Sequence, residues 1–525
     1  MNGRSGGRSA DRPQGVWRPR PRIRSSAAGI DGLFTARVCL STHKKPKNNQ
    51  VFLLWHEICC IVNYGVRYFR AEQYPTSVFC STKENVPMTL ILHPARKAGR
   101  VLMLLSLTGL CAAALPAQAG ITTLASFTGS GDIGSGPYGG VTLDGSGNLF
   151  GTTQFGGASG GGTVYEIKNG TSAITTLASF TGDGAGTNGG SPEAGVTFDS
   201  NGNLFGTTYA GGTSGFGTLY EIAKITGTLT TLASFTGPGA GTNGGNPFAV
   251  VTFDSSGNLF GTTAGGGASG AGTVYEIDNV TGTFTTLASF TGAGTNGSDP
   301  FAGVTFDSKG NLFGTTFLGG ASGNGTVYEI AQGSSIITTL ASFNATNGRS
   351  PAAGVTLDSG GNLFGTTNAG GAHDAGTVYE IAQGSSTITT LASFTGAGGN
   401  GSNPAGGVTL DGGGNLFGTT FQDGEFGNGT VYEIAQGSSI ITTLVSFTGT
   451  NGGNPASAVT FDKSGNLFGT TYGGGASGAG TVYEIAGAGS PVPESSTVIS
   501  LATLLGLGSF LLRARKRRQN ATPGV

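Results

Sequence analysis

His373 and Asp374 are the first residues whose types could do chemistry, because a histidine beside a carboxylate can act as a general acid–base pair. Asp423 and Glu425 are the other candidates, two carboxylates close together in a later glycine-rich segment. Neither pair has a second histidine, a cysteine or a nucleophile-elbow serine beside it. We therefore interpret both pairs as loop variation and expect no catalytic residue, no bound metal and no cofactor.

Another carboxylate recurs along the chain, always just before a turn that ends in Gly-Asn. The segment Asp199–Asn203 faintly resembles a calcium-binding loop, but an EF-hand loop needs further oxygen ligands and a bidentate glutamate at its twelfth position. No glutamate stands at that spacing. The pattern instead predicts a hairpin turn in which the aspartate accepts hydrogen bonds from the local backbone. The seven aspartates are Asp144, Asp199, Asp254, Asp307, Asp358, Asp411 and Asp462.

A glutamate also recurs, in the motif Tyr-Glu-Ile. Residues 120–489 contain only five basic side chains, so these glutamates cannot all form ion pairs. A buried carboxylate without a partner is costly, so we expect them to reach solvent or to accept hydrogen bonds from threonine and backbone groups. They are Glu166, Glu221, Glu276, Glu329, Glu380, Glu433 and Glu484.

These residues belong to one unit that occurs seven times, roughly GVTFD-xxG-NLFGTT-loop-GTVYEI-loop-ITTLASF. Its period of 51–55 residues is typical of repeat architectures. In the third copy, β-rich runs predict four strands of about five to seven residues, and no segment has a helical period. These runs are Val250–Asp254, Leu259–Thr263, Thr273–Ile277 and Phe284–Phe290.

Four strands in each of seven copies predict an all-β fold, a seven-bladed β-propeller with four antiparallel strands per blade. The repeat array begins with an isolated fourth strand, Ile121–Phe127, and its last copy ends at Thr481–Ile485 without one. We therefore expect the N-terminal strand to complete the last blade and close a ring, which leaves no open blade at the seam. A β-helix with two coils per repeat is the alternative architecture.

The loops vary more than the strands. In a propeller blade the short turns lie on one face and the longer connections on the other, where a scaffold normally carries binding. The residue after Gly-Thr-Thr opens onto that second face, and aromatic or amide side chains there suit the stacking and hydrogen bonding of sugar rings. We predict a ligand face that includes Tyr209, Phe317, Phe421 and Tyr472. The other copies place Gln154, Ala264 and Asn368 at this position.

Residues 88–119 have the parts of a secretory signal peptide: a basic stretch after Met88, an apolar run and a small-residue cleavage site at Ala117 and Ala119. Signal peptidase would cut there, directly before the first repeat strand. Residues 1–87 share no composition with the rest of the chain. We interpret them as an upstream extension that is not native to the protein; a genuine disordered extension is the alternative.

Residues 120–489 form the propeller in this interpretation. They contain five Lys and Arg against 22 Asp and Glu, which gives a formal charge of −17 where the whole chain has −1. This charge disfavours nucleic acid and anionic membrane as partners. The same residues include no cysteine, so we expect stability to come from apolar burial between blades rather than from disulfides.

Residues 490–525 carry a second sorting signal. Pro493 and Glu494 precede an apolar run from Val498 to Leu512, short for a bilayer span of about 20 residues, and a basic cluster follows. The layout resembles the PEP-CTERM signal of Gram-negative bacteria, although Ser495 replaces the second proline. The resemblance implies an exosortase that removes the tail, so that the membrane holds the chain only until processing. A plain C-terminal membrane anchor is the alternative.

The repeat resembles the GloVer tandem repeats of secreted bacterial proteins, through Asn-Leu-Phe-Gly-Thr-Thr, the glycine-rich loop and Gly-Thr-Val-Tyr-Glu-Ile across residues 121–485. The resemblance implies an exported β-rich protein and supplies no catalytic residue. We expect a surface-sorted, non-catalytic protein with a binding or structural role at the cell surface or in extracellular polysaccharide, with glycans as its ligands. A propeller lyase or glycosidase is the alternative, and a purely architectural coat protein is a third class.

Overall fold

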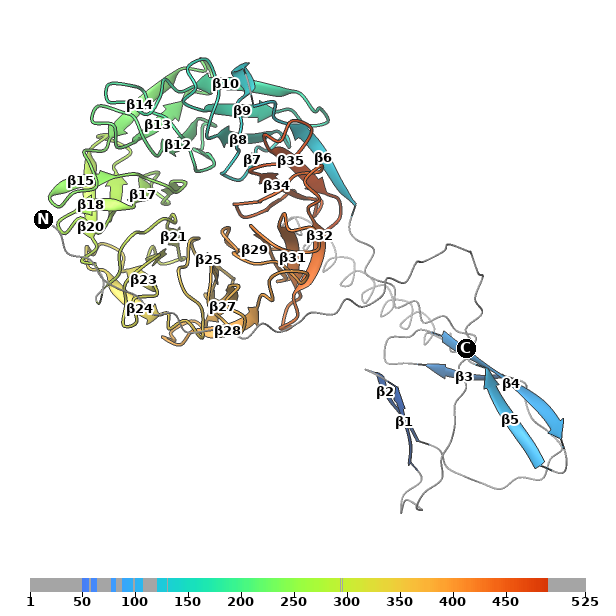
Figure 1. Cartoon of the computed structure of the whole chain (residues 1–525). Helices are drawn as coiled ribbons and strands as arrows, with labels where there is room; N and C mark the ends of the chain where they lie inside the picture. The colour runs from blue at the N-terminus through green and yellow to red at the C-terminus, as the bar shows by residue number, and fades with distance from the viewer. Residues whose placement is uncertain are drawn as a thin grey trace, which may run out of the picture. The chain divides into compact units, whose positions relative to one another are not determined.

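Each of the first six copies of the repeat folds into one four-stranded antiparallel sheet, or blade, whose strands A to D follow one another in chain order, and the seventh blade takes its strand D from the N-terminal end of the propeller. Val, Thr, Phe and Tyr favour the strands, and clusters of Gly, Asn, Asp and Ser end them. Seven blades lie around a ring (Figure 1). The predicted all-β fold, a seven-bladed β-propeller, is confirmed.

The strands of blades 1 to 4 have closely similar lengths. Blade 1 contains β7 (Thr142–Leu143), β8 (Leu149–Thr153), β9 (Thr163–Ile167) and β10 (Ile174–Ser179), and blade 2 contains β11 (Thr197–Phe198), β12 (Leu204–Thr208), β13 (Thr218–Ile222) and β14 (Leu229–Ser234). Blade 3 contains β16 (Thr252–Phe253), β17 (Leu259–Thr263), β19 (Thr273–Ile277) and β20 (Phe284–Ser289), and blade 4 contains β21 (Thr305–Phe306), β22 (Leu312–Thr316), β23 (Thr326–Ile330) and β24 (Thr338–Ser342).

Blades 5 to 7 repeat the pattern. Blade 5 contains β25 (Thr356–Leu357), β26 (Leu363–Thr367), β27 (Thr377–Ile381) and β28 (Thr389–Ser393), and blade 6 contains β29 (Thr409–Leu410), β30 (Leu416–Thr420), β31 (Thr430–Ile434) and β32 (Thr442–Ser446). Blade 7 contains β33 (Thr460–Phe461), β34 (Leu467–Thr471), β35 (Thr481–Ile485) and β6 (Ile121–Ser126). The loops add a short 3-10 helix η1 (Gly131–Ile133) and the pair β15 (Thr242–Gly245) and β18 (Gly265–Gly267).

The ring is closed by the N-terminal strand. β6 pairs antiparallel with β35, with Ile121 opposite Ile485 and Ser126 opposite Thr481. The predicted closure of the last blade is therefore confirmed, and the β-helix alternative is wrong.

Strand A is shorter than predicted. The sequence of the third copy predicted a strand over Val250–Asp254, but β16 contains two residues, Thr252 and Phe253. Asp254 already accepts the hydrogen bonds of the following turn, and Val250 lies in the wall of the central cavity described below.

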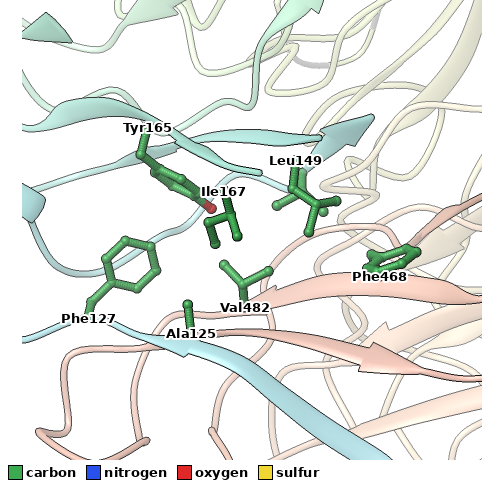
Figure 2. Close-up of a cluster of buried hydrophobic side chains, with 8 residues drawn as sticks. Ala125, Phe127, Leu149, Tyr165, Ile167, Phe468 and Val482 are labelled. Carbon is green, nitrogen blue, oxygen red and sulfur yellow. The ribbon is translucent and has the colours of Figure 1, made fainter. Parts of the chain in front are cut away.

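The core lies between neighbouring blades. Figure 2 shows the cluster at the seam, where Phe127 and Val482 of blade 7 pack with Leu149, Tyr165 and Ile167 of blade 1. All five side chains have at most 4% of their surface exposed. Burial of such side chains contributes about 1.5–3 kcal/mol each, so the seam is held by the same apolar packing as the other blade contacts.

Threonine hydroxyls also join the blades. The first threonine of each Gly-Thr-Thr segment donates to a backbone carbonyl of the next blade, for example Thr152 Oγ1 to Ala194 O at 2.6 Å. Thr470 Oγ1 donates to Gly139 O at 3.0 Å and so carries this pattern across the seam from blade 7 to blade 1. The hydrogen-bonded ring is thus continuous.

The structure describes residues 120–489 except Ser130, Ala293 and Thr295, and five strands nearer the N-terminus. The latter belong to a separate compact unit, Met1–Leu110. They form the pair β1 (Gln50–Trp55) and β2 (Ile58–Asn63) and the sheet β3 (Ser77–Ser81), β4 (Pro87–Lys97) and β5 (Arg100–Ser106).

The predicted sorting residues lie outside the described residues. This applies to Ala117 and Ala119 of the signal peptide and to Pro493 and Glu494 of the tail, so the boundaries drawn there stay predictions. Among the residues that the structure describes, no helix has the length and apolar character needed to cross a membrane.

Candidate functional site

The B–C and D–A loops meet on one face of the ring, which we call the loop face. The D–A loop that enters a blade pairs with the B–C loop of that blade, as in the bridges of Gly190 with Ala210 and of Ser298 with Leu318. The A–B and C–D turns form the opposite turn face.

A central cavity of about 460 Å³ lies where the D–A loops enter the first strands. Each loop contains a proline, and the residue after that proline lines the cavity. In blades 1 to 4 this residue is large, whereas in blades 5 to 7 it is alanine, so the cavity has a one-sided lining. The seven residues are Tyr138, Glu193, Phe248, Phe301, Ala352, Ala405 and Ala456.

Four rings form a continuous arrangement along the cavity, which we call the aromatic wall: Tyr138, Phe248, Phe301 and Phe317. Their centroids are 5.6 Å apart for Tyr138 and Phe248, 5.4 Å for Phe248 and Phe301, and 5.1 Å for Phe301 and Phe317. All three contacts are edge-to-face, the arrangement that aromatic quadrupoles favour, so the rings hold one another in place.

The four residues of the predicted ligand face lie at different distances from this cavity. Phe317 lines it. Tyr209 packs edge-to-face against Phe248, with ring centroids 6.1 Å apart, and Tyr472 packs in the same way against Tyr138 at 5.9 Å. Neither tyrosine lines the cavity, so each contacts a residue of the aromatic wall without facing the cavity itself. Phe421 does not line the cavity and, within residues 120–489 as described, pairs with no other ring.

The sequence prediction missed Tyr138, Glu193, Phe248 and Phe301. A signal for them is present, because the residue after the loop proline changes between copies while its neighbours hardly change. Comparing the seven copies at that position would have identified the wall, whereas the prediction considered only the position after Gly-Thr-Thr.

Glu193 is the one carboxylate among the residues that line the cavity. Its Oε1 accepts a hydrogen bond of 2.9 Å from Gln154 Nε2. Burial raises the pKa of Glu193 to about 7, the Gln154 hydrogen bond opposes that rise, and the charge of Asp183 adds to it. Burial and the nearby Glu193 also raise the pKa of Tyr138.

The recurring aspartates are occupied by their own turns. Asp254 Oδ1 accepts from the backbone N–H groups of Ser256 and Asn258, both at 2.8 Å, and its Oδ2 accepts from Asn258 Nδ2 at 3.0 Å. Asn258 Oδ1 in turn accepts from the N–H of Asn279 at 3.0 Å and links the two turns of the blade. The predicted hairpin turn is confirmed. Within the described residues, no group of three or more His, Cys, Asp and Glu side chains could hold a metal ion.

The glutamates of Tyr-Glu-Ile are all partly exposed, in line with the prediction that they reach solvent. Burial nevertheless raises the pKa of Glu276 and of Glu433.

The two residue pairs interpreted above as loop variation do not lie at the cavity. Asp374 forms a bidentate ion pair with Arg349, with its closest contact at 2.8 Å, and also accepts from Gly370 N–H at 2.9 Å. Asp423 Oδ2 accepts a 2.5 Å hydrogen bond from Ser402 Oγ. These two residues, His373 and Glu425 are absent from the cavity lining.

Comparison with protein families gives one match. Three overlapping segments, residues 108–249, 239–413 and 387–501, match the Gloeobacter/Verrucomicrobia repeat. A comparison with curated proteins gives no match.

Solved structures resemble the chain only distantly. A provisionally named 6-phosphogluconolactonase of Bacteroides uniformis is 15% identical over 61% of this chain and 88% of its own, with a TM-score of 0.40. A puromycin-hydrolyzing peptidase of Mycobacterium tuberculosis is 12% identical over 68% and 53%, with a TM-score of 0.42. A protein of unknown function from Dyadobacter fermentans is 11% identical over 70% and 99%, with a TM-score of 0.36. At these values the names of the three proteins say nothing about the activity of this chain.

Proposed function

This chain belongs to the Gloeobacter/Verrucomicrobia repeat family, and from that premise we propose that it is an exported, surface-sorted protein that binds extracellular glycans without catalysing a reaction. The ligand site is the central cavity with its aromatic wall. The partners in export are a signal peptidase, which cuts after Ala119, and an exosortase, which reads Pro493 and Glu494.

The binding proposal rests on one observation: the central cavity of about 460 Å³ has the aromatic wall on one side and alanine side chains on the other. This volume falls within the range of about 300–1,000 Å³ that is usual for small-ligand pockets. Aromatic rings offer flat apolar surfaces to the C–H faces of sugars, and Gln154, Glu193 and Asn368 offer polar groups next to them. Alanine in blades 5 to 7 leaves room for the sugar.

The binding proposal is tested on a glycan array with the full chain and a Tyr138→Ala, Phe248→Ala, Phe301→Ala triple variant. We expect the triple variant to lose binding. The matched control is Phe426→Ala, which removes a half-exposed ring from a loop of the same face outside the cavity. Binding that survives in the triple variant, and also in a variant with alanine at Tyr209, Phe317, Phe421 and Tyr472, would contradict the proposal.

The positions of the two ends of the described propeller support the proposed surface sorting. Ile121 lies opposite Ile485, and the N–H of Gly489 donates to Gly465 in the A–B turn of blade 7 at 3.0 Å. Both ends of the propeller are therefore on the turn face, and the D–A loops that contribute to the cavity lining are on the opposite face. A tail that holds the turn face toward the membrane leaves those loops facing outward.

An enzyme that acts on the same polysaccharide is the second candidate. The observation that favours it is the raised pKa of Glu193, about 7, because a general acid at neutral pH needs such a value. Glycoside hydrolysis generally uses a pair of carboxylates, and the cavity lining contains one. Release of reducing ends from a bound glycan, abolished by Glu193→Gln, would favour the enzyme over the binding protein.

A further inference from the structure

Glu193 occupies a position that the neighbouring blades fill with aromatic rings. It comes from blade 2, between Tyr138 of blade 1 and Phe248 of blade 3, and those two rings contact each other at 5.6 Å. The carboxylate thus lies beside the aromatic wall at the only blade of the first four that does not contribute a ring after its loop proline.

Among the described residues, none that lines the cavity places a cation beside this carboxylate. The described residues that line the cavity include no Lys, Arg or His. The side chains that act on Glu193 are the Gln154 amide, the Asp183 carboxylate and the Tyr138 phenol, and none of them is positively charged. Asp183 itself accepts a 3.0 Å hydrogen bond from Ser191 Oγ.

The carboxylate is only partly exposed, and this burial raises its pKa. A partly buried carboxylate gains most from a positive charge placed directly beside it. Aromatic rings attract the same kind of charge through their quadrupoles, and carboxylate and rings together are the groups with which proteins hold organic ammonium ions. The formal charge of −17 on residues 120–489 further draws cations toward the molecule.

We propose that Glu193 and the aromatic wall bind an ammonium group, and that the glycan at this site therefore carries free amino sugars. This inference rests on the proposed glycan-binding function and specifies its ligand. The amine of one sugar unit would lie between Glu193 and the rings of Tyr138 and Phe248, while the rest of the unit occupies the alanine-lined side of the cavity.

The experiment compares two ligands that differ at one substituent, the tetramers of glucosamine and of N-acetylglucosamine. Isothermal titration calorimetry of the full chain at neutral pH and physiological salt measures both dissociation constants. We expect the glucosamine tetramer to bind about tenfold more tightly, because acetylation removes the charge that the carboxylate and rings recognise. This comparison needs no variant and so does not depend on the folding of one.

The Glu193→Gln variant then tests whether this side chain causes the preference for the glucosamine tetramer. The variant keeps the size of the side chain and removes its charge, so the two tetramers should bind with equal affinity. Glu425→Gln is the control, because it removes the same charge from an exposed position outside the cavity and should leave the preference intact.

The outcomes separate the inference from the function on which it rests. Equal affinities in the native chain, or an amine preference that persists in Glu193→Gln, overturn the inference while glycan binding stands. Failure of every glycan to bind overturns both.

Discussion

Seven tyrosines, one in each blade, have fully buried side chains whose hydroxyl groups have no hydrogen-bond partner within the described part of the chain. Burial raises their pKa well above the ordinary value for tyrosine. In blade 2 the hydroxyl of Tyr220 lies over Gly206, where an added Cβ would come within 2.4 Å of it. The first position of Gly-Thr-Thr must therefore be glycine, because the tyrosine of the next strand occupies the space that a side chain would need.

Tyr220→Phe tests whether this hydroxyl contributes to stability. The hydroxyl loses its hydrogen bonds to water when the chain folds, and no hydrogen bond within the described residues replaces them. We therefore expect the free energy of unfolding of the variant to stay the same or to rise by about 1 kcal/mol. Tyr220→Ala is the control and should lower it by about 3–5 kcal/mol, since it also removes the ring that packs edge-to-face on Phe180 at 4.9 Å. Equilibrium denaturation measures both, and a clear destabilisation by phenylalanine would reveal a hydroxyl partner.

Glu193 should make stability depend on pH. Its pKa is about 7 in the folded protein and about 4.5 when the chain is unfolded, so the folded state binds more protons between these values. The free energy of unfolding should therefore fall as pH rises from about 4.5 to about 7 and level off above. The groups that face Glu193 are Gln154, Asp183 and Tyr138.

Glu193→Gln should remove this part of the pH dependence and should be more stable than the native chain at pH values above about 7. Thermal unfolding across the pH range measures the difference, with Glu425→Gln as the exposed control. Parallel pH profiles for the native chain and Glu193→Gln would show that burial does not disfavour the charge at this site.

Contacts between residues close together in the sequence could be predicted, whereas a site built from several blades could not. The turn of Asp254 was predictable because its hydrogen-bond donors, Ser256 and Asn258, lie within four residues. The aromatic wall depends on rings from blades 1, 3 and 4 meeting over a cavity. That meeting is set by the geometry of the ring, which no single repeat contains.

β6 closes the ring, because it joins the two ends of the propeller by pairing with β35. Its isolated position in the sequence was enough to predict this role. The short inner strands such as β16 could not be predicted, because residues with β propensity leave the sheet to line the cavity and form the turn.

Deletion of residues 121–127 should open the ring. It removes β6 and the buried ring of Phe127, and it exposes the edge of β35, which invites pairing between molecules. We expect a lower midpoint of thermal unfolding and oligomers in size-exclusion chromatography. A synthetic peptide of residues 120–128 added in trans should restore the monomer, and a peptide of scrambled sequence should not. An unchanged midpoint after deletion would contradict the role of β6 in closure.

In the propeller as a whole, the loop face lies opposite the turn face, where Ile121 and Gly489 mark the two ends of the described repeat region. Residues 120–489 contain no cysteine, so a single introduced cysteine reports the exposure of one face. Ala240 is exposed on a D–A loop and Ser255 on an A–B turn.

With the tail retained by Glu494→Ala, we expect Ala240→Cys to react faster than Ser255→Cys with a bulky impermeant maleimide on intact cells. Both should react equally after solubilisation in detergent. Equal rates on intact cells would contradict the orientation in which the turn face lies toward the membrane.

A crystal structure of the full chain in complex with the glucosamine tetramer would show directly where the sugar binds. We expect a sugar ring in the central cavity against Tyr138, Phe248 and Phe301, with its amine beside Glu193. A tetramer bound on the turn face or at the outer edges of the blades, with the cavity free of sugar, would contradict it.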